Sequence, residues 1–350
     1  MNSLNRKFYI DIAKFIAILS VIFVHLQLNG KSIPVRLISV GIPIVDRVWR
    51  LFSYTIVNSG LTMFMLISGA VRLNNTSNHF TIDYKRHYYD IFKFFLYYII
   101  FSIPFYIYYN RKSLSWDCVL DFFKANYYSY TVAIYWYIPV FLVSFMLILP
   151  VLKKFSALST KIDLYYVLSI YLIIEYVFKF IDISNNLKSN VIANFFIYVY
   201  IYPLIGDLIC NKFTDSDLTI HKFLFFILFA LVNWKLYGYS SIDNVHVSAL
   251  ILITLRYFSI RNSDFNTTQH TMIGKLIKFS ALNSFMFYIL HPYVVKFFYR
   301  VGDILLTESH GLFDYLTALM LLISNFFLTF LIIKMFLKLK YLFTRKMLEE

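Results

Sequence analysis

Long apolar runs separated by short polar connections dominate the chain. A membrane helix needs about 20 mostly apolar residues, and eight runs of this kind are predicted to be spans: 8–28, 49–71, 91–109, 132–152, 163–181, 191–210, 276–301 and 312–337. Two shorter runs, 223–237 and 245–260, flank polar residues and predict a helical hairpin. The pattern therefore predicts an all-α polytopic membrane protein with about ten transmembrane helices, in one integral-membrane domain over residues 1–350.

The basic residues of the connections predict an orientation. Cytoplasmic loops carry an excess of Lys and Arg. With the N-terminus inside, sixteen of these residues fall on the inner side of the spans and eight on the outer side, so we expect both termini to be cytoplasmic. Asp11 and Lys14 interrupt the first apolar run, and no small-x-small site follows Leu28. We therefore expect that run to be an uncleaved helix and not a secretory signal.

Composition supports the membrane class and excludes others. Charged residues make up 15% of the chain and apolar residues 59%, whereas a soluble protein carries about 25% charged residues. The net charge of +14 is explained by membrane orientation, so no nucleic-acid partner is expected. Cys118 and Cys210 are too few for a disulfide framework. No spacing typical of metal ligands occurs, and no metal is expected.

Three ionisable residues, Asp11, Lys14 and His25, lie within the first predicted span. Eleven steps along an α-helix turn about 1100°, only ~20° from three full circles, so Lys14 and His25 share a face at roughly 16 Å along the axis. Asp11 lies on the same stripe and can neutralise Lys14. The spacing predicts a cation toward the cytoplasm and an acid–base group toward the outside. The alternative is a snorkelling Lys14 and a His25 that only hydrogen-bonds between helices.

Four motifs occur in order along the chain. The first is Lys14 followed by ten residues and His25, and the second is the segment 64–69, Phe-Met-Leu-Ile-Ser-Gly. The third is Tyr-Trp-Tyr-Ile at 135–138, and the fourth is Asn-Ser-Phe-Met-Phe-Tyr-Ile-Leu-His-Pro at 283–292. In these motifs and their order the chain resembles the membrane-bound acyltransferase-3 family, from about residue 5 to residue 340.

The resemblance implies transfer of an acyl group, usually acetyl from cytoplasmic acetyl-CoA, to a hydroxyl of a surface polysaccharide or lipid-linked glycan. The enzyme would be a multi-pass protein of the inner (plasma) membrane, in contact with lipid. A sugar hydroxyl needs a base to attack a thioester, and His25 is the candidate general base. His291 is expected as an orienting group; the alternative is that it caps a helix break at Pro292. The cations that would hold the CoA phosphates are Lys14, Lys85, Arg86 and Arg72.

Two positions depart from the family pattern. Lys14 stands where Arg is usual, and Tyr89 stands where the second residue of an Arg-x-x-Arg pair beginning at Arg86 would fall. Lys lacks the planar fork of Arg, so phosphate binding by Lys14 would be less bidentate. These departures bear on donor binding.

Three further motif residues are assigned structural or orienting roles. Ser68 is not preceded two residues earlier by a Gly, as a nucleophile turn requires, so Ser68-Gly69 indicates a close helix crossing. Trp136 is expected to pack or to lie at the membrane interface, and stacking on the acceptor sugar is the alternative.

Two other functions suit a chain with this many spans. One is a glycan transporter or flippase, and the other is a non-catalytic subunit of a polysaccharide assembly machine, which the missing second Arg keeps open. Transporters usually have paired interrupted helices in two related halves, and the sequence contains no internal repeat. Acyl transfer is therefore the leading hypothesis.

Overall fold

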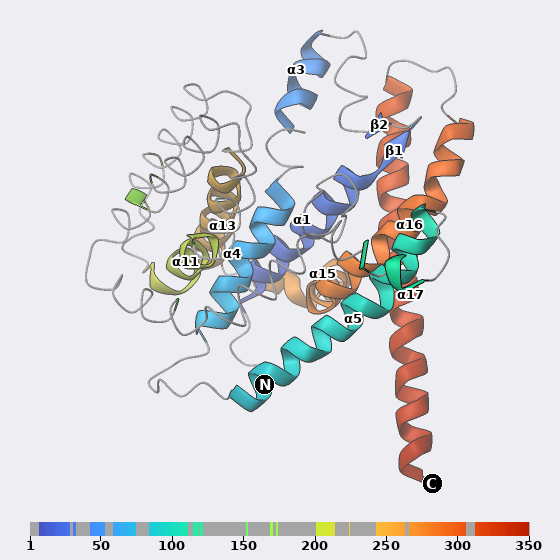
Figure 1. Ribbon diagram of the computed structural model, residues 1–350. Coiled ribbons are helices and arrows are strands. Elements are labelled where there is room, and N and C mark those ends of the chain that lie inside the picture. Colours follow the sequence, from blue (N-terminus) through green and yellow to red (C-terminus); the bar gives the residue numbers. More distant parts are fainter. Residues whose placement is uncertain are drawn as a thin grey trace.

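The computed structural model describes residues 7–28, 31–32, 43–52, 59–74, 84–110, 115–118, 120–121, 152, 169–170, 173, 201–213, 224, 243–262, 265, 267–305 and 312–349. These residues are nearly all helical. α1 (Phe8–His25) lies at the centre (Figure 1), packed against α4 (Ser59–Asn74), α13 (Asp243–Arg261), α15 (Met272–Leu282), α16 (Ser284–Leu305) and α17 (Leu312–Glu349). The other helices are α3 (Pro43–Phe52), α5 (Tyr84–Asn110), α11 (Tyr202–Asp207), the π-helix η6 (Leu208–Lys212) and the 3₁₀-helix η7 (Thr268–His270).

α1 ends earlier than its apolar run. The backbone of Leu26 is extended, and the strands β1 (Gln27–Leu28) and β2 (Lys31–Ser32) pair antiparallel. Two residues, Asn29 and Gly30, connect them, and Asn-Gly is the dipeptide most typical of tight hairpins. The predicted span 8–28 is therefore wrong at its end, because backbone pairing replaces the helix after His25.

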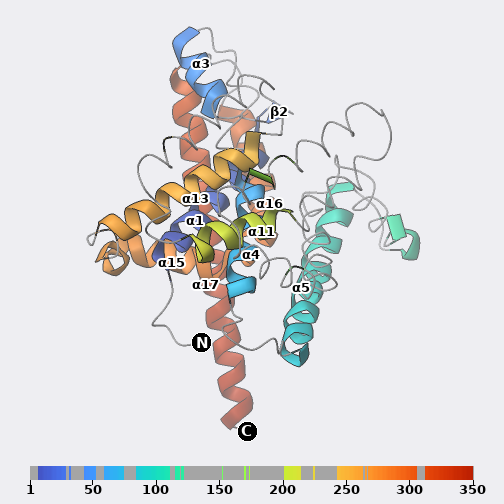
Figure 2. The ribbon, with the colours of Figure 1, turned by 90° about the vertical axis from the view of Figure 1, so that its left-hand side faces the viewer.

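Glycines bring the backbones of α4 and α11 into contact. A Cβ on Gly206 would lie 1.7 Å from the carbonyl oxygen of Leu66, and a Cβ on Gly69 would lie 2.2 Å from backbone atoms of Pro203. No side chain fits at either position without separating the two helices. In Figure 2, α11 lies against α4, and α13 lies next to both.

Two cationic side chains cap the C-terminal end of η6 by donating hydrogen bonds to its carbonyl oxygens. Arg256 of α13 donates through Nη1 to the carbonyl oxygen of Ile209 and through Nη2 to that of Phe213. Lys7 donates through Nζ to the carbonyl oxygen of Cys210 at 2.7 Å. Burial and the nearby Arg256 guanidinium lower the pKa of the Lys7 ammonium. Because the last carbonyls of a helix lack partners and carry partial negative charge, these cations fix both α13 and the start of α1 against η6.

The predicted span 276–301 is broken. α15 and α16 meet at Asn283 with an angle of 88° between them. Asn283 ends α15, where its backbone N–H and its side-chain Nδ2 both donate to the carbonyl oxygen of Phe279. α16 is one helix through Pro292, so the break in this predicted span lies at Asn283 and not at the proline. Pro292 removes a single N–H, which a packed helix tolerates.

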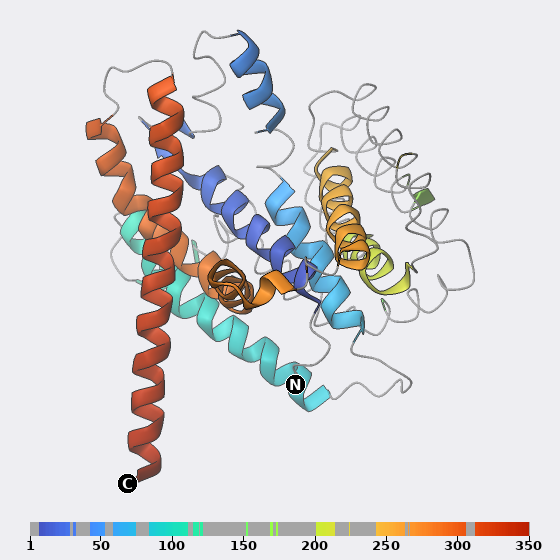
Figure 3. The same ribbon diagram turned by 180° about the vertical axis from the view of Figure 1, so that it is seen from behind.

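Other helix boundaries also differ from the predictions. The predicted span 49–71 covers the end of α3 and most of α4, and residues 53–58 between them lie outside the described residues. α17 continues to Glu349, beyond the predicted end at 337. Lys and Arg are good helix formers, and no Gly or Pro interrupts this last segment. Figure 3 shows the C-terminal part of α17 extending past the other helices.

Apolar side chains cover the outer faces of α5 and α17. Exposed examples are Tyr89, Phe92, Ile100, Met320, Leu331 and Met335. Among the described residues, two helices are long and apolar enough to cross a membrane, Phe8–His25 and Tyr315–Leu342, with a third if α15 and α16 form one broken span. This apolar surface is that of a membrane protein.

Several predicted spans cannot be compared with helices of the structure. The spans 132–152, 163–181 and 223–237 lie outside the described residues apart from single positions, and only residues 201–210 of the span 191–210 are described. The ten-helix count and the cytoplasmic location of both termini therefore stay predictions.

Candidate active site

Two histidines from opposite ends of the sequence lie side by side. His25 is the last residue of α1, and His291 lies in the first half of α16. The centroids of their imidazole rings are 5.3 Å apart, and the ring planes are inclined by 33°. His291 is 0% exposed, whereas His25 is half-buried. The structure thus brings together the candidate general base, His25, and the residue expected to orient it, His291.

Hydrogen bonding fixes the tautomer of His291. Its Nδ1 lies 3.1 Å from the carbonyl oxygen of Phe287. A carbonyl oxygen can only accept, so Nδ1 carries the proton and Nε2 has a lone pair. Within the part of the chain that the structure describes, the buried Nε2 has no hydrogen-bond partner. The core therefore contains a basic nitrogen beside His25.

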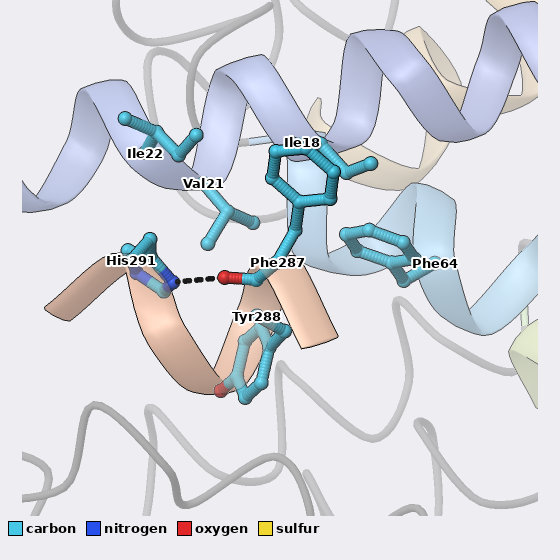
Figure 4. Close-up of a pocket in the computed structure, with 7 residues that line it drawn as sticks. All are labelled: Ile18, Val21, Ile22, Phe64, Phe287, Tyr288 and His291. Atoms are coloured by element: carbon cyan, nitrogen blue, oxygen red, sulfur yellow. Dashed lines mark hydrogen bonds between the residues drawn. The ribbon is translucent and has the colours of Figure 1, made fainter. Parts of the chain in front are cut away.

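A narrow pocket lies against His291. Figure 4 shows its walls, which come from three helices: Ile18, Val21 and Ile22 of α1, Phe64 of α4, and Phe287, Tyr288 and His291 of α16. These side chains pack closely, and the space between them is too small to hold a water molecule, whereas most ligand pockets measure roughly 300–1,000 Å³. Its walls are apolar apart from one imidazole, so a small uncharged group such as a short acyl chain would fit there only if these side chains moved apart.

The α1 wall of the pocket follows the stripe from Lys14 to His25. Ile18, Val21 and Ile22 lie four, seven and eight residues after Lys14, on the face that His25 completes. Lys14 and His25 are both half-buried and lie at the two ends of this stripe. Neither lines the pocket itself, so of the predicted site residues His291 alone forms part of its wall among the described residues.

The whole chain was compared with known proteins. The model of the acyltransferase-3 family, described as an acyltransferase domain, matches residues 7–336. The chain belongs to the acyltransferase-3 family. No curated protein and no solved structure matches it. Membership indicates acyltransferase activity, and together with the apolar helices it identifies a membrane protein.

Other predicted residues of this acyltransferase lie in α1 and α4. Asp11 is buried one turn before Lys14. Ser68 is half-buried and precedes Gly69, which lies at the crossing with α11. Because that crossing is backbone against backbone, Gly69 acts on the packing of α4, the helix that contributes Phe64 to the pocket.

The predicted phosphate-binding cations lie at two helix ends. Arg72 is in the last turn of α4, and Lys85 and Arg86 are in the first turn of α5. The side chains of all three, and the whole of Trp136, lie outside what the structure describes. Their roles stay predictions.

Two residues of this candidate site were not among those predicted from the sequence. The ring of Tyr288 lies 5.8 Å from that of His291, and Phe64 forms the α4 wall of the pocket. A signal existed for Tyr288, since it lies three residues before His291 and therefore on the same side of a helix. Phe64 begins the motif at 64–69, but that motif by itself does not indicate which of its residues lines a pocket.

Proposed function

We propose that this acyltransferase transfers an acetyl group from cytoplasmic acetyl-CoA to a hydroxyl of a surface polysaccharide or lipid-linked glycan, as a multi-pass protein of the plasma membrane. One observation carries the proposal. The pocket lies on the face of α1 between Lys14 and His25, and its wall includes His291, whose ring is 5.3 Å from that of His25.

His25 serves as the general base. The acceptor hydroxyl bonds to the thioester carbonyl carbon as its proton passes to His25. The carbon–sulfur bond then breaks, and the CoA thiolate takes that proton from the imidazolium. The half-buried position of His25 at the end of α1 supports this role, since an acceptor from the outer side can reach it while water access is limited.

His291 stabilises the charged form of His25. Its Nδ1 is held by Phe287, and its Nε2 lone pair is buried. An imidazolium formed at His25 has N–H donors, and a neighbouring nitrogen acceptor favours it. His291 is therefore an orienting group for the base, which agrees with its expected role.

Cations on the cytoplasmic side hold the donor. Lys14 is the candidate on α1, and Arg72, Lys85 and Arg86 are the candidates on α4 and α5. With the CoA phosphates bound there, the pantetheine arm would run along the stripe of α1 toward His25, and the acetyl group would reach the apolar pocket.

The experiment is an ester-forming assay in membranes. Membranes that contain the protein are incubated with radiolabelled acetyl-CoA and glycan acceptor, and label is measured in an ester. We expect His25→Ala to abolish labelling while the protein still inserts and stays folded, and Lys14→Ala to raise the KM for acetyl-CoA, with Lys14→Arg restoring it. Lys278, exposed on α15, provides a matched control as Lys278→Ala. Transfer by His25→Ala would contradict the proposal, and a transporter or a non-catalytic subunit predicts no ester at all.

A further inference from the structure

An asparagine is buried in the middle of α17 without hydrogen bonds from its side chain. Asn325 is 0% exposed, and neither its Oδ1 nor its Nδ2 has a partner among the described residues. Its backbone carbonyl oxygen accepts a hydrogen bond from Thr329 Oγ1 at 2.8 Å. Buried amides in native proteins almost always have partners. A primary amide with both ends unsatisfied in an apolar core points to a polar group that binds there.

The packing of α16 and α17 puts Asn325 at the level of His291. Ala318 and Leu321 of α17 pack in one cluster with Val295 of α16, and further along α17 the ring of Phe326 stacks on Phe287 at 5.2 Å. Moving along this interface, the residue numbers increase on α17 while they decrease on α16. The two helices are therefore antiparallel. One turn forward from Leu321 is Asn325, and one turn back from Val295 is His291.

The buried stripe of α17 faces the same two helices. Ala318, Leu321, Asn325 and Thr329 are separated by three or four residues and are all buried, so they lie on one side of the helix. The first two belong to the same apolar cluster as Phe23 of α1 and Val295 of α16. The amide of Asn325 therefore lies on the side of α17 that packs on α1 and α16, one turn from the cluster that joins them.

We propose that Asn325 is a catalytic residue whose amide N–H donates to the carbonyl oxygen of the acyl thioester; this inference rests on the proposed function. When the acceptor oxygen bonds to the carbonyl carbon and its proton passes to His25, the carbonyl electron pair moves onto the oxygen. The amide N–H of Asn325 stabilises that oxyanion. Its collapse restores the carbonyl and breaks the carbon–sulfur bond, and the thiolate receives the proton from His25, giving an ester and free CoA. An uncharged donor suits this place, because a carboxylate would repel the developing negative charge.

Two non-reactive donor analogues test the inference without an acceptor. One is a ketone analogue of acetyl-CoA, which keeps the carbonyl oxygen, and the other is a thioether analogue, which lacks it. We expect the purified full-length protein to bind the ketone more tightly, and Asn325→Leu to lose that preference while it still binds the thioether. Thr329→Val changes the same stripe one turn away and should keep the preference. Asn325→Ser, which is smaller and still polar, serves if the leucine variant does not fold.

Activity gives the second readout. Asn325→Leu should lower kcat by about 10²- to 10³-fold, as loss of one oxyanion donor does, with a melting temperature equal to or above that of the wild type. A ketone preference kept in Asn325→Leu, or absent from the wild type, would overturn the inference. Failure of the wild type to bind either analogue would instead refute the proposed function.

Discussion

The imidazole rings of His25 and His291 lie 5.3 Å apart between centroids, although one residue ends the first helix and the other lies near the end of the chain. Each was a candidate from its own motif, and the motifs alone do not say that the two meet. The contact exists because α16 packs directly on α1. It joins a half-buried imidazole to one that is fully buried and fixed by Phe287.

Substitutions at His291 separate the roles of its two nitrogens. His291→Asn keeps a donor near Nδ1 for Phe287 but loses the Nε2 lone pair, whereas His291→Gln keeps an acceptor near Nε2. Hydrogen bonds to charged groups contribute about 1.5–3 kcal/mol, which is roughly 10- to 150-fold in rate. We expect kcat to fall by such a factor in His291→Asn and to be partly retained in His291→Gln. Equal activities of the two variants, measured with the ester assay, would refute a role for Nε2.

Alanine substitutions at the glycines should destabilise the protein in a fixed order. A Cβ would lie 1.7 Å from the Leu66 oxygen in Gly206→Ala, 2.2 Å from Pro203 in Gly69→Ala, and 2.7 Å from Ser20 Cβ in Gly60→Ala. Overpacking costs about 1–3 kcal/mol or more. The melting temperature in detergent should therefore fall most in Gly206→Ala and least in Gly60→Ala.

A second substitution distinguishes the causes. Because the closest contact at Gly60 is a side-chain atom, Ser20→Gly should partly restore the stability of Gly60→Ala. The contact at Gly206 is with backbone, so Leu66→Ala should not rescue Gly206→Ala. Rescue of both variants, or of neither, would contradict the crossing geometry.

Loss of Arg256 should loosen α13 from η6. In Arg256→Ala the carbonyl oxygens of Ile209 and Phe213 lose the two donors of the guanidinium. Each unsatisfied buried group costs about 1–3 kcal/mol, so thermal unfolding should occur at a clearly lower temperature. Arg256→Lys, with a single ammonium, should restore only part of this loss.

Arg261 is the matched control for Arg256 on the same helix. It is exposed, and its guanidinium lies 5.9 Å from the ring centroid of Tyr257. An exposed cation–π contact is worth about 0.5–1 kcal/mol, so Arg261→Ala should change the melting temperature little. A fall as large as that of Arg256→Ala would show that loss of charge, and not loss of the carbonyl contacts, is responsible.

Two adjacent phenylalanines of α17 should respond differently to truncation. Phe326 is 3% exposed, stacks on Phe287 and meets Phe15 edge-on at 5.3 Å. Phe327 is 47% exposed on the lipid-facing side. Phe→Ala in a core costs about 3–5 kcal/mol, so Phe326→Ala should lower the melting temperature strongly and Phe327→Ala only slightly. Because Phe287 lines the pocket, Phe326→Ala should also reduce acyl transfer; similar effects of both variants would disprove this packing.

The bend at Asn283 illustrates the limit of local sequence signals. Pro292 was the obvious helix breaker, yet α16 continues through it, and the 88° bend lies at an asparagine. An isolated Asn is a weak signal, because it ends helices and also occurs within them. The bend is stable only because α15 and α16 both pack against α1.

Asn325 illustrates the same limit for the site. In the sequence it is one polar residue in a long apolar run. The first helix was singled out because Asp11, Lys14 and His25 are ionisable, and Asn325 is not. Its burial and its level beside His291 follow from the antiparallel register of α16 and α17. That register depends on contacts between the two helices, such as the stacking of Phe326 on Phe287.

The sequence by itself determined that this chain is a helical membrane protein of the acyltransferase-3 family, and it identified His25 as the candidate base and His291 as a candidate orienting group. These properties are local: hydrophobicity adds along a segment, helical spacing sets which residues share a face, and motifs are contiguous. Only the tertiary structure decided that the two imidazoles meet, that the pocket lies between α1, α4 and α16, and where the helices end. Those outcomes depend on how distant surfaces fit together, and close packing at positions such as Gly69 and Gly206 selects one arrangement among many that share the same apolar pattern.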